Sequence, residues 1–315
     1  MSRRNGIQRL LFGLAVVVLL LILPFILSSY QLGLLTKMII FAIFAMSLNL
    51  LLGYTGLPSL GHAAYFGAAA YAIALLSLRV TQNTFWIDFP AGLALAAVTS
   101  ALFGLLALRT HEGYFLMITL ALSQVLWGIA FGWKSLTRGD DGIPGVPRPN
   151  LGLPWSLSDG VPFYFFVLFF FIVTVALLWV IVRSPFGHAL VGIRESEARM
   201  KVLGYNVWLY KFVAFILAGL FAGLAGNLFA YYNGFVSPAY LSMIFSATAL
   251  IMVILGGTGS LIGPAVGAAV IVFLENAISV YTQRWLLVLG VIYVVVTLFA
   301  PRGLTGLFAE RRRAT

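Results

Sequence analysis

The sequence predicts an all-α polytopic membrane protein, built as a single transmembrane domain over residues 1–315. Hydrophobic residues make up 62% of the chain and charged residues only 9%, whereas a soluble domain carries about 25% charged residues. Apolar runs of membrane-spanning length, about 20 residues, recur along the whole chain. A water-soluble fold could not bury this much apolar surface, so lipid is the expected solvent.

Ten apolar windows are the expected transmembrane helices. The first follows the basic segment 1–9; it is too long for a cleaved secretory signal and lacks the A-x-A ending, so it is expected to be retained. The eighth and tenth windows are short. In chain order the windows are 10–29, 32–52, 59–78, 86–108, 114–133, 161–182, 210–231, 241–256, 263–281 and 285–300.

The basic residues predict the orientation of these helices. With the N-terminus inside, 13 of the 19 Lys and Arg residues fall on the cytoplasmic side and 6 fall outside, as the positive-inside rule requires. Both termini are then cytoplasmic. The net charge of +10 is explained by this topology, which argues against nucleic-acid binding. The absence of cysteine excludes disulfides, thiolate metal sites and cysteine nucleophiles.

Two long polar segments connect the expected helices. Residues 134–160, expected in the periplasm, are rich in the residues that form turns. This segment is either a plain surface loop or a docking surface for an external partner. Residues 183–211, expected in the cytoplasm, are too charged to enter lipid.

The cytoplasmic segment is expected to form one short surface helix. Ser184 and Pro185 signal its start, and Gly204 signals its end. Glutamates four residues before basic residues support an exposed charged face, and apolar residues form a second face. The charged pairs are Glu195–Arg199 and Glu197–Lys201, and the apolar residues are Leu190, Ile193 and Val202.

This helix is either a solvated connector or a coupling helix that docks on a soluble motor. The chain has no GxxxxGK[ST] motif and no Gly-Lys pair, so it has no P-loop of its own. Any ATP-driven work would therefore come from a partner, and no cofactor is expected in this chain.

Three stretches are dense in small residues: 53–72 (GYTGLPSLGHAAYFGAAAYA), 214–230 and 256–270. Small residues allow close helix packing in a membrane, where no hydrophobic drive brings helices together. Alternatively, the glycines mark broken helices that line a substrate path. In the first stretch, Pro58 and the glycines are expected to form a cytoplasmic turn, with Ser59 as the N-cap of the next helix.

Ionisable residues within the spans are candidate functional residues. For His62 the alternatives are a structural bond to a backbone carbonyl and a pathway role; for Glu275 they are a structural pair with Arg284 and a pathway role. Lys37 and Asp88 lie near helix ends, where their side chains are expected to reach the interface. The candidate pathway residues are Ser59, Gly61, His62 and Glu275. No paired carboxylates, nucleophile elbow or metal-ligand spacing is present, so catalysis and a metal site are not expected.

The stretch GYTGLPSLGHAAYFGAAAYA resembles the G-x-x-G-x-x-S-L-G-H-A signature of inner-membrane permeases for branched-chain amino acids. The segments GIRESEARMKVLGYNVWLYKFVAF, AGLFAGLAGNLFAYYNGFVSP, LGGTGSLIGPAVGA and FAPRGLTGLF are similar to that family in the same order, so the resemblance covers residues 53–308. The long outside loop and the GFVSP segment favour the LivM type of the two paired permeases. Pro58 departs from the family pattern and is expected to stiffen the turn.

The resemblance implies one half of a heterodimeric pore in the bacterial inner membrane. The implied partners are a second homologous permease, two cytoplasmic ATP-binding-cassette ATPases and a periplasmic substrate-binding protein. The coupling role would fall on the positions that match the family's cytoplasmic loop: Gly192, Arg194, Glu195, Ala198, Lys201 and Gly204.

Three other readings remain open. The same machine could import urea, short-chain amides or other small solutes, because the binding protein supplies most selectivity in such systems. An ion-coupled secondary transporter would use Glu275 and His62 as a proton relay. A purely structural membrane subunit is the third alternative.

Overall fold

The computed structural model describes residues 17–81, 84–110, 112–152 and 157–281, together with residues 284, 287, 288, 290, 291 and 294. Within this part of the chain, five helices are long and apolar enough to cross a membrane, and two shorter apolar helices accompany them. The all-α prediction is thus confirmed. The first and tenth predicted windows lie largely outside the described residues.

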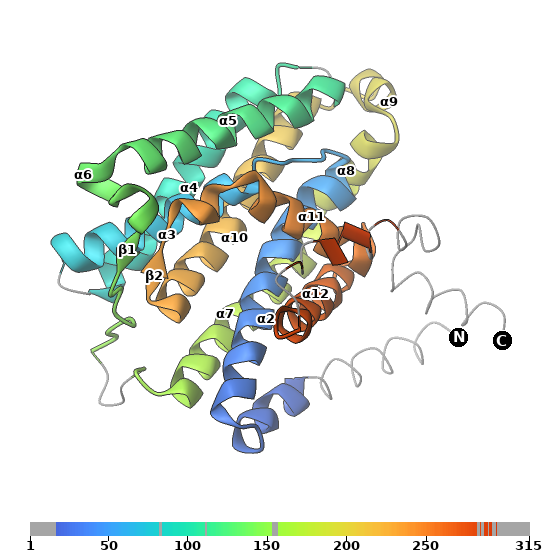
Figure 1. Ribbon diagram of the computed structural model, residues 1–315. Helices are drawn as coiled ribbons and strands as arrows, with labels where there is room; N and C mark the ends of the chain where they lie inside the picture. Colours follow the sequence, from blue (N-terminus) through green and yellow to red (C-terminus); the bar gives the residue numbers. More distant parts are fainter. Residues whose placement is uncertain are drawn as a thin grey trace.

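The second to ninth predicted windows each correspond to a helix, with bounds that differ by a few residues (Figure 1). The helical elements are η1 (Leu23–Phe25), α2 (Ser29–Asn49), η2 (Leu50–Thr55), α3 (His62–Arg79), α4 (Phe85–Ala107), α5 (Glu112–Gly132), α6 (Lys134–Thr137), η3 (Gly139–Asp141), α7 (Gly160–Arg183), α8 (Pro185–Glu195), α9 (Glu197–Val202), α10 (Val207–Asn233), η4 (Pro238–Leu241), α11 (Met243–Gly256) and α12 (Gly263–Ser279). The short strands β1 (Ile143–Pro144) and β2 (Phe235–Val236) form one antiparallel ladder.

The core of the bundle is built by α10 packed against α3, α4 and α2, with α12 beside α2 (Figure 1). The small residues of α10 make this packing possible. A Cβ at Gly226 would overlap the carbonyl oxygen of Phe66, and one at Gly223 would overlap the side chain of Ala96. Helices that approach this closely need glycine at the contact, so close packing accounts for the stretch 214–230.

Alternate connections lie at opposite ends of the bundle. At one end, which we call the Arg194 end, Arg194 at the end of α8 contacts the α2–α3 turn and the α11–α12 turn. At the other end, the Arg148 end, β1 pairs with β2 and Thr84 bridges to Asn150. The chain therefore threads back and forth, as the succession of predicted spans requires.

The segment 134–160 is more ordered than a plain loop. It contains α6, η3 and β1, and buries Ile143 and Val146 in the core. Arg148 donates hydrogen bonds to the carbonyl oxygens of Leu157, Ser158 and Asp159, at 2.6–3.0 Å. Burial lowers the pKa of Arg148, and the nearby Asp159 opposes that shift. The guanidinium gathers the end of this segment onto the start of α7.

The turn between α2 and α3 differs from the predicted one. The α2 helix ends in the π-helical turn η2, and Gly56 follows in the left-handed conformation (φ +77°). Ser59 is not the N-cap of α3, because that helix begins at His62 and has Gly61 as its N-cap. The buried Ser59 hydroxyl instead accepts a hydrogen bond from the Gly61 amide, at 3.2 Å.

The predicted single surface helix is two helices, α8 and α9. The extended conformation of Ser196 (φ −163°, ψ 102°) ends α8, and its hydroxyl caps α9 by accepting from the Arg199 amide. The start signal is confirmed, since Ser184 caps α8 and Pro185 is its first residue. Val202 was wrongly placed in the apolar stripe: it is 88% exposed, and Met200 is buried in its stead.

Candidate functional site

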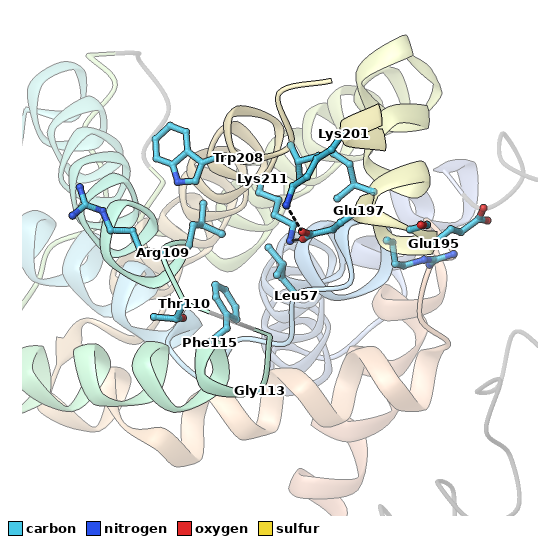
Figure 2. Close-up of a pocket in the computed structure, with 15 residues that line it drawn as sticks. Leu57, Arg109, Thr110, Gly113, Phe115, Glu195, Glu197, Lys201, Trp208 and Lys211 are labelled. Carbon is cyan, nitrogen blue, oxygen red and sulfur yellow. Dashed lines mark ion pairs between the residues drawn. The ribbon is translucent and has the colours of Figure 1, made fainter. Parts of the chain in front are cut away.

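A cleft of about 820 Å³ opens at the Arg194 end, between the α4–α5 turn and the α8–α9–α10 segment (Figure 2). Its lining is mainly polar, with four basic and two acidic side chains. The charged lining residues are Arg109, Arg194, Glu195, Glu197, Lys201 and Lys211. Five of the six come from the segment 183–211 that the sequence marks as a coupling region.

A small apolar core holds α8 and α9 against the start of α10. It consists of Ala189, Ile193, Met200 and Val207. Gly192 belongs to this contact, since a Cβ there would lie 2.9 Å from the Met200 sulfur. The helix pair is therefore a packed unit that moves with α10, which a solvated connector would not be.

Charges reinforce this unit. Glu197 forms ion pairs with Lys211 of α10 and, at 3.6 Å, with Lys201 of its own helix (Figure 2). The predicted Glu197–Lys201 pair is confirmed. The Glu195–Arg199 pair spans the break at Ser196, so the two residues do not share one helix face, and no ion pair joins them in the described structure. Glu195 is exposed and available to another protein.

Arg194 turns toward the bundle. Its guanidinium donates to the carbonyl oxygen of Gly53 in η2, and its aliphatic stem packs on Gly56. The same guanidinium lies close to Gly259 in the α11–α12 turn. Asn49 completes the knot by accepting from the Gly259 amide at 3.0 Å and donating to the Ser260 carbonyl at 2.8 Å. One side chain of α8 thus touches both turns at this end of the bundle.

The other residues implied in coupling lie farther out. Ala198, Lys201 and Gly204 are exposed, and Gly204 has a positive φ of 86° with open space around its Cα. Beyond them, the sequence analysis missed an exposed apolar tip formed by Val202, Leu203 and Tyr205. The signal for the tip was the break at Ser196, which rotates Val202 away from the α8 stripe.

The structure brings together three of the four candidate pathway residues. Ser59, Gly61 and His62 are buried at the start of α3, next to α5, where a Cβ at Gly61 would crowd the Thr119 carbonyl. Glu275 lies elsewhere, four residues before the end of α12 and toward the Arg148 end. A relay between His62 and Glu275 therefore has no support in this geometry.

His62 is bonded to a serine rather than to the backbone carbonyl that the sequence suggested. Its Nε2 lies 2.8 Å from the Ser47 hydroxyl, and its ring stacks on Phe44 at 5.5 Å. Ser47 donates its single proton to the Phe44 carbonyl, at 2.6 Å, so His62 Nε2 is the donor to Ser47. His62 Nδ1 then faces the interior as an acceptor without a partner in the described structure.

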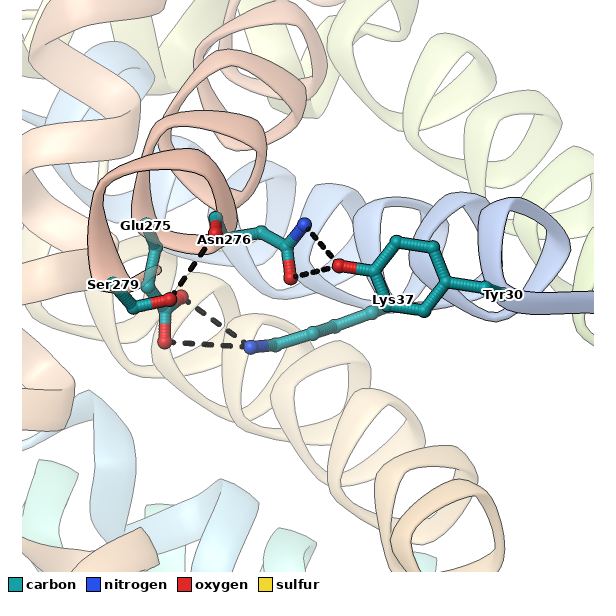
Figure 3. Close-up of polar contacts among 5 residues, drawn as sticks. All are labelled: Tyr30, Lys37, Glu275, Asn276 and Ser279. Atoms are coloured by element: carbon teal, nitrogen blue, oxygen red, sulfur yellow. Dashed lines mark hydrogen bonds and ion pairs between the residues drawn. The ribbon is translucent and has the colours of Figure 1, made fainter. Parts of the chain in front are cut away.

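Glu275 pairs with Lys37 of α2, where the spacing had suggested Arg284 (Figure 3). Beside it, Asn276 exchanges hydrogen bonds with the Tyr30 hydroxyl, at 2.7 and 3.0 Å. Asp88 does not reach the interface as predicted; it is buried in the first turn of α4 and accepts from Thr81. Among the described residues, no group of three or more His, Asp or Glu could hold a metal ion.

A bundle of membrane-length helices, with a packed and charged helix pair at one end, defines a multi-pass membrane protein with a transmission surface for a partner. Comparison of the sequence with known families places it further. The family described as branched-chain amino acid transport system / permease component matches residues 30–299, and this chain belongs to that family.

Individual relatives agree with this assignment. The chain is 29% identical, over 95% of its length and 76% of the relative's, to the high-affinity branched-chain amino acid transport system permease protein LivM of Escherichia coli. Identity to the LivM protein of Salmonella typhimurium is 30% with the same coverage. A probable LivM protein of Methanocaldococcus jannaschii is 23% identical over 84% of this chain and 90% of its own. No solved structure matches the chain.

Proposed function

We propose that this chain is a membrane-spanning permease subunit of an ATP-binding-cassette importer, carrying branched-chain aliphatic amino acids from the periplasm to the cytoplasm across the bacterial inner membrane. Its proposed partners are a second homologous permease, two cytoplasmic ATPases and a periplasmic binding protein. Family membership supports the type of machine, and the names of the relatives support the cargo.

The observation that carries the proposal is the construction of the α8–α9 unit. It presents an exposed apolar tip (Val202, Leu203, Tyr205) and exposed charges to the outside of the bundle. On its inner side, Arg194 grips the carbonyl of Gly53. An exposed apolar patch with a polar rim is typical of a protein–protein contact. A partner bound at the tip would therefore be connected through Arg194 to the helices that line the core.

The mechanism follows from the linkage rule that a partner shifts a conformational equilibrium only when it binds the two states differently. ATP binding and release in the motor would displace the α8–α9 unit. The Lys211–Glu197 pair would carry that displacement to α10, and Arg194 would carry it to the two turns beside η2. The two permease halves would then rock to open the path alternately to each side.

An importer of urea or short-chain amides is the second candidate, because the relatives include permeases named for other cargoes, among them an autoinducer 2 import permease and a ribose import permease. The external binding protein would decide between these cargoes. A secondary transporter is disfavoured, since the two residues that its relay needs lie apart.

Co-purification and uptake test the proposal. Affinity capture of the tagged chain should bring down a second permease and two ATPases, and the reconstituted complex should take up leucine in an ATP-dependent way. Reversal of both charges in Glu195→Lys/Glu197→Lys, or strain from Gly204→Val at positive φ, should uncouple hydrolysis from uptake. A chain that purifies alone and transports without ATPases would refute the proposal.

A further inference from the structure

The polar cluster on the flank of α2 and α12 is the strongest feature that the coupling mechanism leaves unused (Figure 3). Lys37 Nζ lies 3.3 and 3.4 Å from the two carboxylate oxygens of Glu275. Asn276, one residue further along α12, bonds to Tyr30, one turn below the start of α2. Two charges and two neutral polar groups therefore share one face.

The depth of this cluster limits what it can face. Lys37 lies eight residues into α2, about 12 Å along a helix, and each side chain of the ion pair is 26% exposed. Charges inside the hydrocarbon region turn toward protein or water, because exposure to lipid is costly. This flank of α2 therefore borders an aqueous space or another subunit.

A cavity of about 370 Å³ adjoins the ion pair. Lys37, Tyr30 and Asn276 line its polar side, and Leu34 and Phe229 line an apolar side. This size lies in the range of about 300–1,000 Å³ that small-molecule sites occupy. Glu275 stands behind Lys37 and is not part of the lining.

We propose that this cavity is a transient binding site for a zwitterionic α-amino acid with an aliphatic side chain, whose carboxylate binds Lys37. The ammonium group of the ligand is received by Glu275 and by the Asn276 side-chain oxygen, and its aliphatic part lies on Leu34 and Phe229. The assignment of an amino acid as the ligand rests on the proposed function.

The geometry of the pair suits exchange with such a ligand. The Lys37–Glu275 contacts of 3.3–3.4 Å are longer than the roughly 2.7–2.9 Å of tight charge-assisted hydrogen bonds. A zwitterion that enters between the two groups replaces one opposite-charge contact by two, so no charge is left unpaired. Each replacement is close to balanced, and a transport site has to release what it binds.

Charge removal tests the site in the complete importer reconstituted in liposomes, with labelled leucine and saturating binding protein. Lys37→Met and Glu275→Gln should each lower uptake about tenfold or more, the loss expected for a hydrogen bond to a charged group. Co-purification of the ATPases should be unchanged in both variants. Lys134→Met, an exposed lysine at the same end of the bundle, is the matched control and should transport normally.

The double variant Lys37→Glu/Glu275→Lys separates this role from a purely structural ion pair. A structural pair would be restored by the exchange, and uptake would return to the wild-type rate. A ligand site would stay impaired, since a glutamate would now line the cavity and repel the carboxylate of the amino acid. Wild-type uptake in this double variant would overturn the proposal.

Gly33 offers a steric test that spares the charges. It lines the cavity, and a Cβ there would lie 3.6 Å from the Tyr232 hydroxyl, an ordinary contact. Gly33→Ala should fold normally with a raised KM for uptake, and Gly33→Leu should lower uptake further at unchanged thermal stability. Full uptake by Gly33→Leu would also overturn the site. A wild-type complex that imports no leucine would instead overturn the proposed cargo, and the amino-acid assignment with it.

Discussion

Replacement of Arg194 by alanine should uncouple ATP hydrolysis from transport while the importer remains assembled. The Arg194 guanidinium donates to the Gly53 carbonyl, and its stem packs on Gly56. Alanine removes both contacts, yet it keeps α8 intact because alanine has the highest helix propensity. Arg194 makes these contacts on the bundle side of the α8–α9 unit, away from the exposed tip, so the surface offered to a partner is unchanged.

The magnitude follows from the single bond that is lost. A hydrogen bond from a charged donor contributes about 1.5–3 kcal/mol, which corresponds to about 10- to 150-fold in an equilibrium. Because Arg194 is largely exposed, water partly replaces the bond, and we expect the lower end of this range. The number of leucine molecules imported per ATP hydrolysed should therefore fall about tenfold.

The assay measures leucine uptake and phosphate release in parallel in proteoliposomes. Arg199→Ala, on the exposed face of the neighbouring α9, is the control and should leave the ratio unchanged. An unaltered ratio in Arg194→Ala would refute the inward coupling route. Loss of ATPase co-purification would also refute it, by placing Arg194 on the partner surface.

Three stability predictions concern the packing of the bundle and are checked by thermal unfolding in detergent. Gly226→Val should destabilise by about 1–3 kcal/mol or more through overpacking against the Phe66 carbonyl, whereas Gly128→Ala, where a Cβ meets open space, should be neutral or mildly stabilising; equal effects would contradict the packing argument. Asn49→Ala should cost about 1–3 kcal/mol by leaving the α11–α12 turn without two hydrogen bonds, and an unchanged melting temperature would count against it. Ser47→Ala should cost a similar amount, because the buried Nε2–H of its histidine partner loses its acceptor; a silent substitution would show that this bond does not form.

The transmembrane helices were predictable because each carries its own signal. A run of about 20 apolar residues identifies a span without knowledge of its neighbours, as the match of the window 161–182 with α7 (Gly160–Arg183) illustrates. The start of α8 was equally local, since Ser184 and Pro185 provide the cap and the first residue.

Features that depend on distant partners could not be predicted in this way. The pairing of Lys37 with Glu275 joins residues 238 positions apart, and nothing in the spacing along one helix points to it. The break at Ser196 was missed because the charge spacing continued across it, while burial of Met200 against α8 decided the conformation. Ser59 was misplaced for a related reason: its turn is shaped by contact with α5, which brings Thr119 against Gly61.

The π-helical turn η2 amounts to one surplus residue in an otherwise α-helical rod. Removal of one residue between Leu50 and Thr55 would restore regular winding and rotate the preceding part of α2 by about 100°, the turn per residue of an α-helix. Asn49 and Ser47 would then face different neighbours, and the Gly53 carbonyl would return to the helix ladder, out of reach of Arg194. The insertion thus sets the angular phase between the upper and lower parts of α2. Movement of the π-turn by one residue along the rod would switch that phase without unfolding either part.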